Sequence, residues 1–278
     1  GFCMSERQKK NLPKGKYKAF INSKFKKGKL NLGEIFIKGK SSKEIFFSTY
    51  ICHPSLANNE LSGPVLSSAI ANYIIKNYKK SEFSYRFVFL PETIGAIAYL
   101  SKKIKILKKN VICGFVLSCV GDERRYSIIN SREGNTLADI ALKASLIGKK
   151  RVINYSYLKR GSDERQYCSP NVNLPVCGFS RSKYGTYPEY HTSADNLNLV
   201  SQKGLNQSFE IIKNIVDAFE LSYIPKNNHF GEPQLSKKKL YPGINAFNGK
   251  FKPLTTSEEM FIRMNTIAYS DNKNSIFD

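Results

Sequence analysis

Runs of apolar, strand-forming residues alternate with runs of helical periodicity along most of this chain of 278 residues. Residues 45–50 form the kind of nearly continuous apolar run that is buried on both faces of a sheet. The next run, 64–76, repeats its apolar residues at helical spacing and has a proline in its first turn. The same alternation predicts strands over 85–90, 111–120 and 174–179 and helices over 95–103, 136–147 and 204–221.

This alternation predicts an α/β fold, a sandwich with a mostly parallel, mixed central sheet. The main domain is expected over 17–225, with a small inserted β segment over 17–44 where short strand-like runs are separated by glycine turns. Residues 226–266 are polar and rich in Gly, Pro and Lys, which predicts an extended arm, although 257–268 is also compatible with the start of a helix.

The chain carries 44 Lys and Arg against 22 Asp and Glu, a net charge of +22. A nucleic acid or another anionic partner would explain such an excess. The cations, however, are mostly Lys, they are spread along the chain, they lack interleaved aromatic residues, and Trp is absent. We therefore attribute the charge to a Lys-rich composition and expect no nucleic-acid partner.

The location of the protein is predicted from segments that the sequence lacks. No apolar run approaches the roughly 20 residues of a membrane-spanning helix, and the chain opens without a secretory signal. The six cysteines contain no CxxC pair, which is typical of buried free thiols in a reducing compartment. We expect a cytoplasmic protein with no membrane partner, and the sequence leaves an oligomer open.

Polar residues that are able to bind a metal lie at the predicted strand ends. His53 and Glu60 share the loop after strand 45–50, and an imidazole and a carboxylate at this spacing can converge on Zn²⁺. Glu60 is equally compatible with a helix-capping role. Glu92 follows strand 85–90 and suits either a general base or a helix N-terminal acid. Asp122 follows the third strand as a metal ligand or as an ion-pair partner.

Four stretches resemble, in order, the motifs of an aminopeptidase-like family that is often found in bacterial surface-polysaccharide gene clusters: FSTYICHPSLANNELSGPVLSSAIA, FVFLPETIGAIAYL, GSDERQYCSPNVNLPV and EYHTSADNLNLVS. That family is similar in turn to the zinc aminopeptidases of the leucyl-aminopeptidase and glutamate-carboxypeptidase type, which implies a three-layer sandwich. Its members extend further at both ends. Residues 1–16 are thus expected to end a missing N-terminal segment, and 267–278 to begin a truncated winged-helix module.

The resemblance implies roles for single residues. His53 matches the first zinc ligand and His191 the last. Asn59 or Glu60 stands where the aminopeptidases carry an aspartate that bridges two zinc ions, and only Glu60 supplies an anionic oxygen. Glu92 matches the general base of the family.

Two departures from the family pattern change the expected metal content. Thr93 stands where the aminopeptidases carry a carboxylate ligand of the second zinc, and the ligand expected after strand 111–120 is Asp122 in one alignment and Ser118 or Cys119 in another. A second zinc site is therefore doubtful. We expect one zinc ion with water in its open position, bound by His53, Glu60 and His191.

The predicted function is a zinc-dependent hydrolase of amide bonds, in which Glu92 activates a metal-bound water for attack on a small peptide or N-acyl substrate. The alternative, motivated by Thr93, is a degenerate metal-binding relative that binds or deacylates a polysaccharide precursor. Asp195 is expected to orient the loop of His191. The residues expected to bind substrate are Asp163, Glu164, Arg165, Arg181, Tyr187 and Tyr190, and structural ion pairing is the other interpretation of the charged ones.

Overall fold

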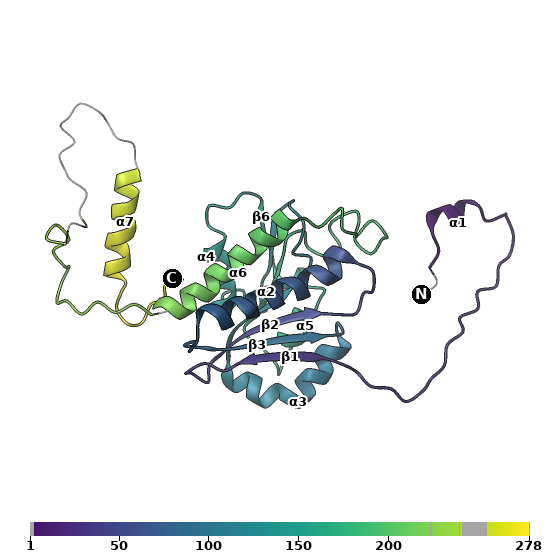
Figure 1. Ribbon diagram of the computed structural model, residues 1–278, viewed down its shortest axis with the longest axis horizontal. Helices are drawn as coiled ribbons and strands as arrows, with labels where there is room; N and C mark the ends of the chain where they lie inside the picture. The colour runs from purple at the N-terminus through teal and green to yellow at the C-terminus, as the bar shows by residue number, and fades with distance from the viewer. Residues whose placement is uncertain (1–2, 223, 239, 241–254, 278) are drawn as a thin grey trace, which may run out of the picture. The chain divides into compact units, whose positions relative to one another are not determined.

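The computed structural model describes residues 3–222, 224–238, 240 and 255–277, and it separates into two compact units, Gly1–Asn31 and Leu32–Asp278 (Figure 1). Among the described residues of the first unit, the one regular element is helix α1 (Glu6–Lys10). A capping box closes its N-terminus, because Ser5 and Gln8 exchange side chain–backbone hydrogen bonds.

The second unit is built on a seven-stranded mixed sheet with the strand order β1-β3-β2-β4-β7-β5-β6. The four central strands run parallel, whereas β1 pairs antiparallel with β3, and β5 pairs antiparallel with β7. This confirms the predicted fold class. The strands are β1 (Gly33–Ile37), β2 (Glu44–Tyr50), β3 (Ser84–Leu90), β4 (Val111–Leu117), β5 (Tyr126–Ile129), β6 (Val152–Tyr155) and β7 (Val176–Ser180).

Helices cover both faces of this sheet, which makes three layers (Figure 1). One face carries α2 (Ser62–Asn77), α4 (Leu137–Ser145) and α6 (Gln202–Ser222), and the other carries α3 (Ile94–Asn110) and the short α5 (Glu164–Tyr167). A π-helix, Ala57–Leu61, leads directly into α2. None of the described helices is both long enough and apolar enough to cross a membrane.

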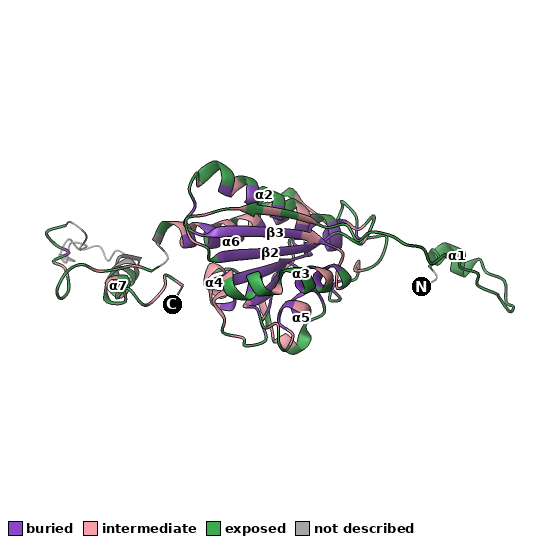
Figure 2. Ribbon diagram, turned by 90° about the horizontal axis from the view of Figure 1, so that it is seen from below, coloured by how far each residue is buried: buried purple, intermediate pink, exposed green. Residues whose placement is uncertain are grey.

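Each face of the sheet has its own hydrophobic core, because successive side chains of a strand point to opposite faces. Phe46 packs with Leu100 under α3, whereas Phe47 packs with Ile70 under α2. Figure 2 shows β2 and β3 buried along their length between the helical layers. Gly63 lets α2 approach this sheet, since a Cβ there would lie 2.2 Å from Thr49 Oγ1.

The structure corrects the prediction of an inserted β segment over 17–44. Residues 17–31 contain no strand, and only Gly33–Ile37 joins the sheet, as its edge strand β1. The earlier part of the segment is Lys-rich, and its apolar side chains, such as Phe20 and Phe25, are exposed rather than packed. The strand predicted over 111–120 ends at Leu117, since Cys119 adopts a positive φ of 53°.

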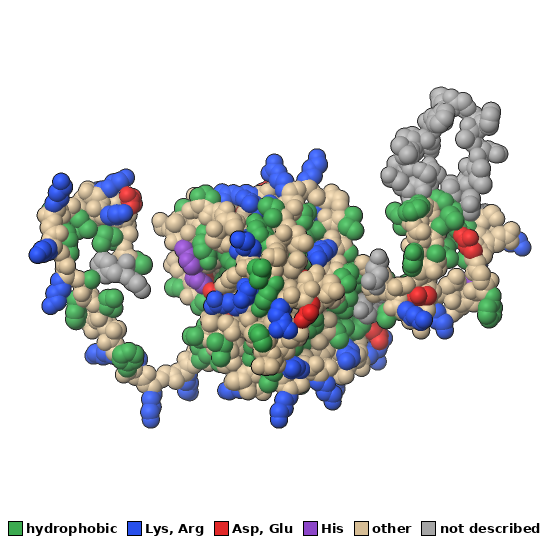
Figure 3. Space-filling view, turned by 180° about the vertical axis from the view of Figure 1, so that it is seen from behind, with side chains coloured by type: hydrophobic (Ala, Val, Ile, Leu, Met, Phe, Trp, Pro, Cys, Tyr) green, Lys and Arg blue, Asp and Glu red, His purple; other side chains and the backbone are tan. Residues whose placement is uncertain are grey.

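The segment 226–266 is only partly an extended arm. Residues 241–254 lie outside the described part, and α7 (Thr255–Ala268) occupies the end of the segment, where the helical alternative was noted. Lys226 pairs with Asp271 in an isolated antiparallel bridge, and the Phe277 ring lies 5.1 Å from that of Phe219 on α6. The winged-helix module remains a prediction. On the face shown in Figure 3, Lys and Arg side chains are more frequent than acidic ones.

Candidate active site

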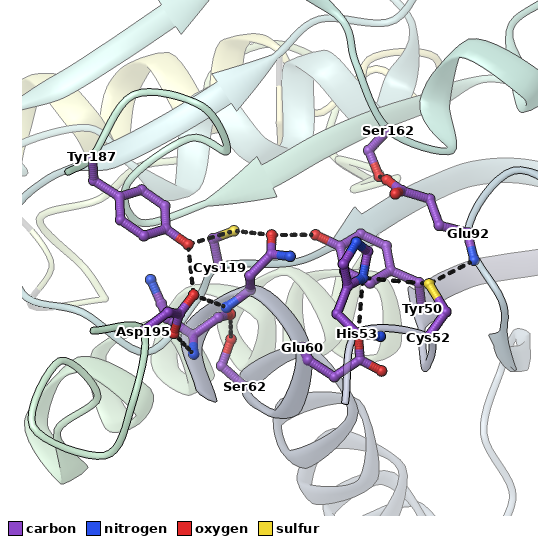
Figure 4. Close-up of polar contacts among 12 residues, drawn as sticks. Tyr50, Cys52, His53, Glu60, Ser62, Glu92, Cys119, Ser162, Tyr187 and Asp195 are labelled. Carbon is purple, nitrogen blue, oxygen red and sulfur yellow. Dashed lines mark hydrogen bonds and ion pairs between the residues drawn. The ribbon is translucent and has the colours of Figure 1, made fainter. Parts of the chain in front are cut away.

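The parallel strands bring most of the predicted site residues to one edge of the sheet. β2, β3, β4 and β7 all end there, and the loops that follow them carry the candidate residues. Cys52 and His53 follow β2, Glu92 follows β3, Asp122 follows β4, and His191 lies in the long loop after β7. Figure 4 shows several of these side chains facing one another.

The centre of the site is a cluster of three possible metal ligands. Cys52, His53 and Glu60 each offer one ligand atom, and these atoms all lie within 4.8 Å of one another. His53 Nδ1 lies 3.2 Å from Glu60 Oε2 and 3.3 Å from Cys52 Sγ (Figure 4). Burial raises the pKa of Glu60, and hydrogen bonding to His53 opposes that shift.

These spacings fit a zinc ion. Ligands at about 2.0–2.3 Å in a tetrahedral arrangement are separated by about 3.3–3.6 Å, close to the distances that join Nδ1 of His53 to Glu60 and Cys52. Imidazole, carboxylate and thiolate are also the ligand types that zinc takes in proteins. Burial raises the pKa of the Cys52 thiol, so a metal would have to displace its proton on binding.

His191 lies beside this cluster. Its ring centroid is 5.2 Å from that of His53 and 3.9 Å from that of Tyr190, on which it stacks. The residue is exposed and adopts a positive φ of 56°. The structure therefore brings three of the predicted ligands, His53, Glu60 and His191, to one place.

The π-helix that carries Glu60 is held by a buried carboxylate on the loop of His191. Asp195 accepts hydrogen bonds from the backbone N–H groups of Asn58 at 2.6 Å and Asn59 at 3.0 Å. The phenol of Tyr187 donates to the same carboxylate at 3.1 Å. Because Asp195 lies four residues beyond His191, one side chain ties together the two loops that supply the ligands.

Glu92 contacts the cluster through its backbone, and its side chain is held by Ser162. Its N–H donates to Cys52 Sγ at 3.2 Å, and its Oε1 accepts a hydrogen bond from Ser162 Oγ at 2.6 Å (Figure 4). Among the described residues, no hydrogen bond reaches Glu92 Oε2. The carboxylate is thereby oriented through one of its two oxygens.

Thr93, the residue after Glu92, connects the loop that follows β3 to the loop of Asp163 and Arg165. Thr93 adopts a positive φ of 63°, which is strained for a β-branched residue. Its N–H donates to Asp163 Oδ1 at 2.7 Å, and its hydroxyl accepts from Arg165 at 3.1 Å. Burial raises the pKa of Asp163 to about 7.

The structure does not bring Asp122 into the ligand cluster. The carboxylate is 1% exposed and accepts four hydrogen bonds, from the Asn58 amide, the Arg124 N–H, and the N–H and hydroxyl of Ser182. Both of its oxygens are occupied by these loops. In this structure Asp122 connects the loops after β2, β4 and β7.

A buried polar chain lies beside the cluster, and of its members the sequence named Asn59, Cys119 and Tyr187 in other roles but missed Tyr50. The phenol of Tyr50 and the thiol of Cys119 both donate to Asn59 Oδ1, at 3.1 and 3.4 Å. Asn59 Nδ2 is buried and has no hydrogen-bond partner among the described residues. Tyr187 joins this chain to Asp195, and burial raises the pKa of Cys119 to about 12.

Cys52 was also missed, because buried, unreactive thiols were the expected role of the cysteines. Four of the six cysteines are buried, but Cys3 and Cys52 are exposed. The signal for Cys52 was its position directly before His53 at a strand end. Ser162, the partner of Glu92, carried no comparable signal.

Of the six residues predicted to bind substrate, some are accessible and the others are buried. Arg165 is exposed and Tyr190 is half-buried beside His191, so both are accessible from the cluster. Asp163 and Tyr187 are buried and hold loops, as described above. Glu164 is also fully buried and accepts hydrogen bonds from Tyr184 and from the N–H groups of Gly161 and Ser162. Arg181 lies elsewhere, under Tyr126.

The sequence matches the family described as "Domain of unknown function (DUF4910)" over residues 9–222. A curated relative from Clostridium acetobutylicum is named "Putative polysaccharide biosynthesis protein with aminopeptidase-like domain". The two are 36% identical over 281 residues, which cover 100% of this chain and 62% of the relative. The chain therefore spans less than two thirds of the length of that relative.

Two solved structures have folds similar to that of this chain. A crystal structure named "putative peptidase" from Clostridium acetobutylicum superposes with a TM-score of 0.75 at 34% identity, over 89% of this chain and 54% of that one. A zinc aminopeptidase from Bacillus subtilis superposes with a TM-score of 0.55 at 19% identity, over 67% of this chain and 48% of that one. The fold is thus aminopeptidase-like.

Proposed function

The chain belongs to the family described as domain of unknown function DUF4910, and on that premise we propose that it is a zinc-dependent hydrolase of amide bonds. The observation that carries the proposal is the cluster of Cys52, His53 and Glu60, whose ligand atoms lie within 4.8 Å of one another beside His191. Its place at the carboxyl edge of an aminopeptidase-like sheet supports the same conclusion.

We propose that His53, Glu60 and His191 hold the zinc ion and that Cys52 is a further candidate ligand. When bound, the ion would supply a water of lowered pKa and polarise the carbonyl of the scissile amide. The hydrogen bond from His53 N–H to Glu60, at 2.7 Å, fixes the carboxylate beside the imidazole. This hydrogen bond thereby holds two of the proposed ligands side by side.

Proton transfer is assigned to Glu92. Ser162 fixes its Oε1, so Oε2 is the oxygen that accepts the proton of the attacking water and later returns it to the leaving amine. Tyr190 is a candidate donor to the developing oxyanion, because its half-buried phenol ring stacks on His191 beside the cluster. Arg165, exposed beside Thr93, is placed to contact an acidic group of the substrate.

Substitution of Glu92 tests the mechanism. Glu92→Gln keeps the hydrogen bond from Ser162 but removes the base, so amide hydrolysis should fall by about 10²–10⁴-fold. Elemental analysis should find one zinc per chain in both proteins. Glu133→Gln, at an exposed glutamate on another loop, is the matched control and should keep full activity. Normal turnover in the Glu92 variant would overturn the mechanism.

The name of the curated relative supports a second candidate, an amidase that removes an acyl group from a polysaccharide precursor or a protein that binds one. The same groups would serve, because an N-acyl sugar is also an amide. Aminoacyl amides and N-acetylated amino sugars, assayed side by side with the wild-type protein, separate the two substrate classes. Hydrolysis of neither by zinc-loaded protein would favour a binding role.

A further inference from the structure

A cavity of about 650 Å³ lies outside the candidate active site and is strongly basic. It is lined by 123–126, 148–151, Arg181 and the first turns of α6. Seven of its thirteen lining residues are Lys or Arg and two are Glu. None of the proposed zinc ligands lines it, and neither does Glu92.

One cation of the lining, Arg181, is buried and forms no ion pair with any described residue, although Glu123, which also lines the cavity, interacts with it electrostatically. Arg181 is 2% exposed, and its guanidinium lies 4.0 Å from the centroid of the Tyr126 ring. It donates one hydrogen bond, to Gln207 Oε1 at 2.9 Å, and its Nε has no partner among the described residues. Burial of a charge without a close opposite charge is costly, and an anion bound beside Arg181 would offset that cost.

The lining of the cavity carries six further cations, and four of them form no ion pair with a described residue. Arg124 and Lys203 have carboxylate partners, Glu189 and Glu123, each at 2.7 Å. In contrast, the remaining four cations of the lining form no ion pair with any described residue. These are Arg125, Lys149, Lys150 and Arg151. The positive charge is thus concentrated in one hollow and exceeds what its own carboxylates balance.

We propose that this cavity binds a small polyanion that carries at least two phosphate-type groups. Guanidinium groups match the geometry of phosphate oxygens. The five cations without an ion pair carry more positive charge than a ligand with a single carboxylate would neutralise. The volume is in the range of small-ligand pockets, about 300–1,000 Å³, and suits a molecule of nucleotide size. A compact cavity also differs from the extended basic groove along which a nucleic acid binds, so a small ligand is favoured. The proposal does not depend on the proposed hydrolase activity.

Calorimetric titration of the full chain with pyrophosphate tests this proposal. The protein is treated with EDTA beforehand, so that metal at the candidate active site does not contribute. Pyrophosphate should bind at least about tenfold more tightly than inorganic phosphate, and binding should weaken as NaCl screens the cations. Binding should be unchanged in Glu92→Gln, so failure here and failure of the hydrolase proposal are distinguishable.

Two variants and a control locate the site. The triple variant K149Q/K150Q/R151Q should weaken pyrophosphate binding at least about tenfold, whereas K102Q/K103Q/K105Q, with the same change of charge on the exposed surface of α3, should change it less than about twofold. Arg181→Met should lose binding yet unfold at the same or a higher temperature without ligand, because it removes an uncompensated buried charge. Equal losses in the two triple variants, unchanged binding in Arg181→Met, or no pyrophosphate binding at low salt would overturn the proposal.

Discussion

Hydrogen bonds stabilise the carboxylate of Asp195, which is buried and forms no ion pair with any residue that the structure describes. It receives two backbone N–H groups of the π-helix and the phenol of Tyr187. Asp195→Asn turns one acceptor oxygen into a donor that faces another donor. We expect the free energy of unfolding in urea to fall by about 1–3 kcal/mol.

Tyr187→Phe is the graded control for Asp195→Asn. It removes only the phenol hydroxyl, with its contacts to Asp195 and Cys119, so it should cost about 1 kcal/mol. Zinc affinity should fall more in the Asp195 variant than in the Tyr187 variant, because Asp195 also positions the π-helix that carries Glu60. Stability of Asp195→Asn equal to the wild type would contradict this role.

Asp163 makes the stability depend on pH in an identifiable direction. Burial raises its pKa to about 7, whereas the unfolded chain has a value of about 3.9. Between these values the folded protein keeps a proton that the unfolded chain has released. The contribution of Asp163 to the free energy of unfolding therefore falls as pH rises through this window, by at most about 1.4 kcal/mol per pH unit.

Asp163→Asn removes this titration and keeps an acceptor for the Thr93 N–H. Relative to the wild type, the variant should gain stability from pH 4 to about pH 7, and the gain should level off above that pH. Urea unfolding of both proteins at four pH values in this range measures the gain. A difference between them that stays constant with pH would contradict the assignment.

The residues of the candidate site were predictable to different degrees. His53, Glu60 and Glu92 stood out because polar residues at strand ends converge in a parallel sheet, whereas His191 was expected from the family resemblance. The structure does bring them together, and their roles remain predictions. Cys52 was missed, since one thiol carries no spacing signal, and Ser162 reaches Glu92 from a distant loop.

At the scale of elements, a buried ion-pair network joins the edge strand β1 to the sheet. Arg86 on β3 contacts Glu44 on β2 at 2.6 Å and Glu34 on β1 at 2.8 Å. Arg86→Met would leave two glutamates without their cation, at a cost of about 3–5 kcal/mol in urea unfolding. Arg132→Met, which breaks an exposed pair with Glu133 at 3.3 Å, should cost less than about 1 kcal/mol. Equal effects of the two variants would contradict this account.

The predictability of an element followed its length and burial. The long helices α2 and α6 and the strands β2 and β3 carry periodic or continuous apolar patterns, and the sequence located each within a few residues. β5 and β6 were missed, because each has four residues and β6 alternates exposed with half-buried positions. The antiparallel pairing of β5 with β7 depends on tertiary contacts that no local pattern reports.

At the scale of the whole molecule, the charge of +22 repels itself in the folded state. Raising NaCl from 0.01 to 0.15 M shortens the Debye length from about 30 to 8 Å. We expect the unfolding temperature to rise by about 2–4 °C, which corresponds to about 1 kcal/mol in a chain of this size. Differential scanning calorimetry at constant pH measures the shift, and a lower unfolding temperature in salt would contradict the role of self-repulsion.

The π-helix Ala57–Leu61 has a consequence for how this protein can diverge between lineages. Its turn closes from Leu61 N–H to Leu56 C=O, one residue more than an α-helical turn. Loss of a single codon here would shift the preceding loop by one helical position, about 100° around the axis of α2. His53 would then face a different direction while the sheet stayed intact. Insertions and deletions at this turn can therefore alter the chemistry of the molecule more readily than point substitutions in its core.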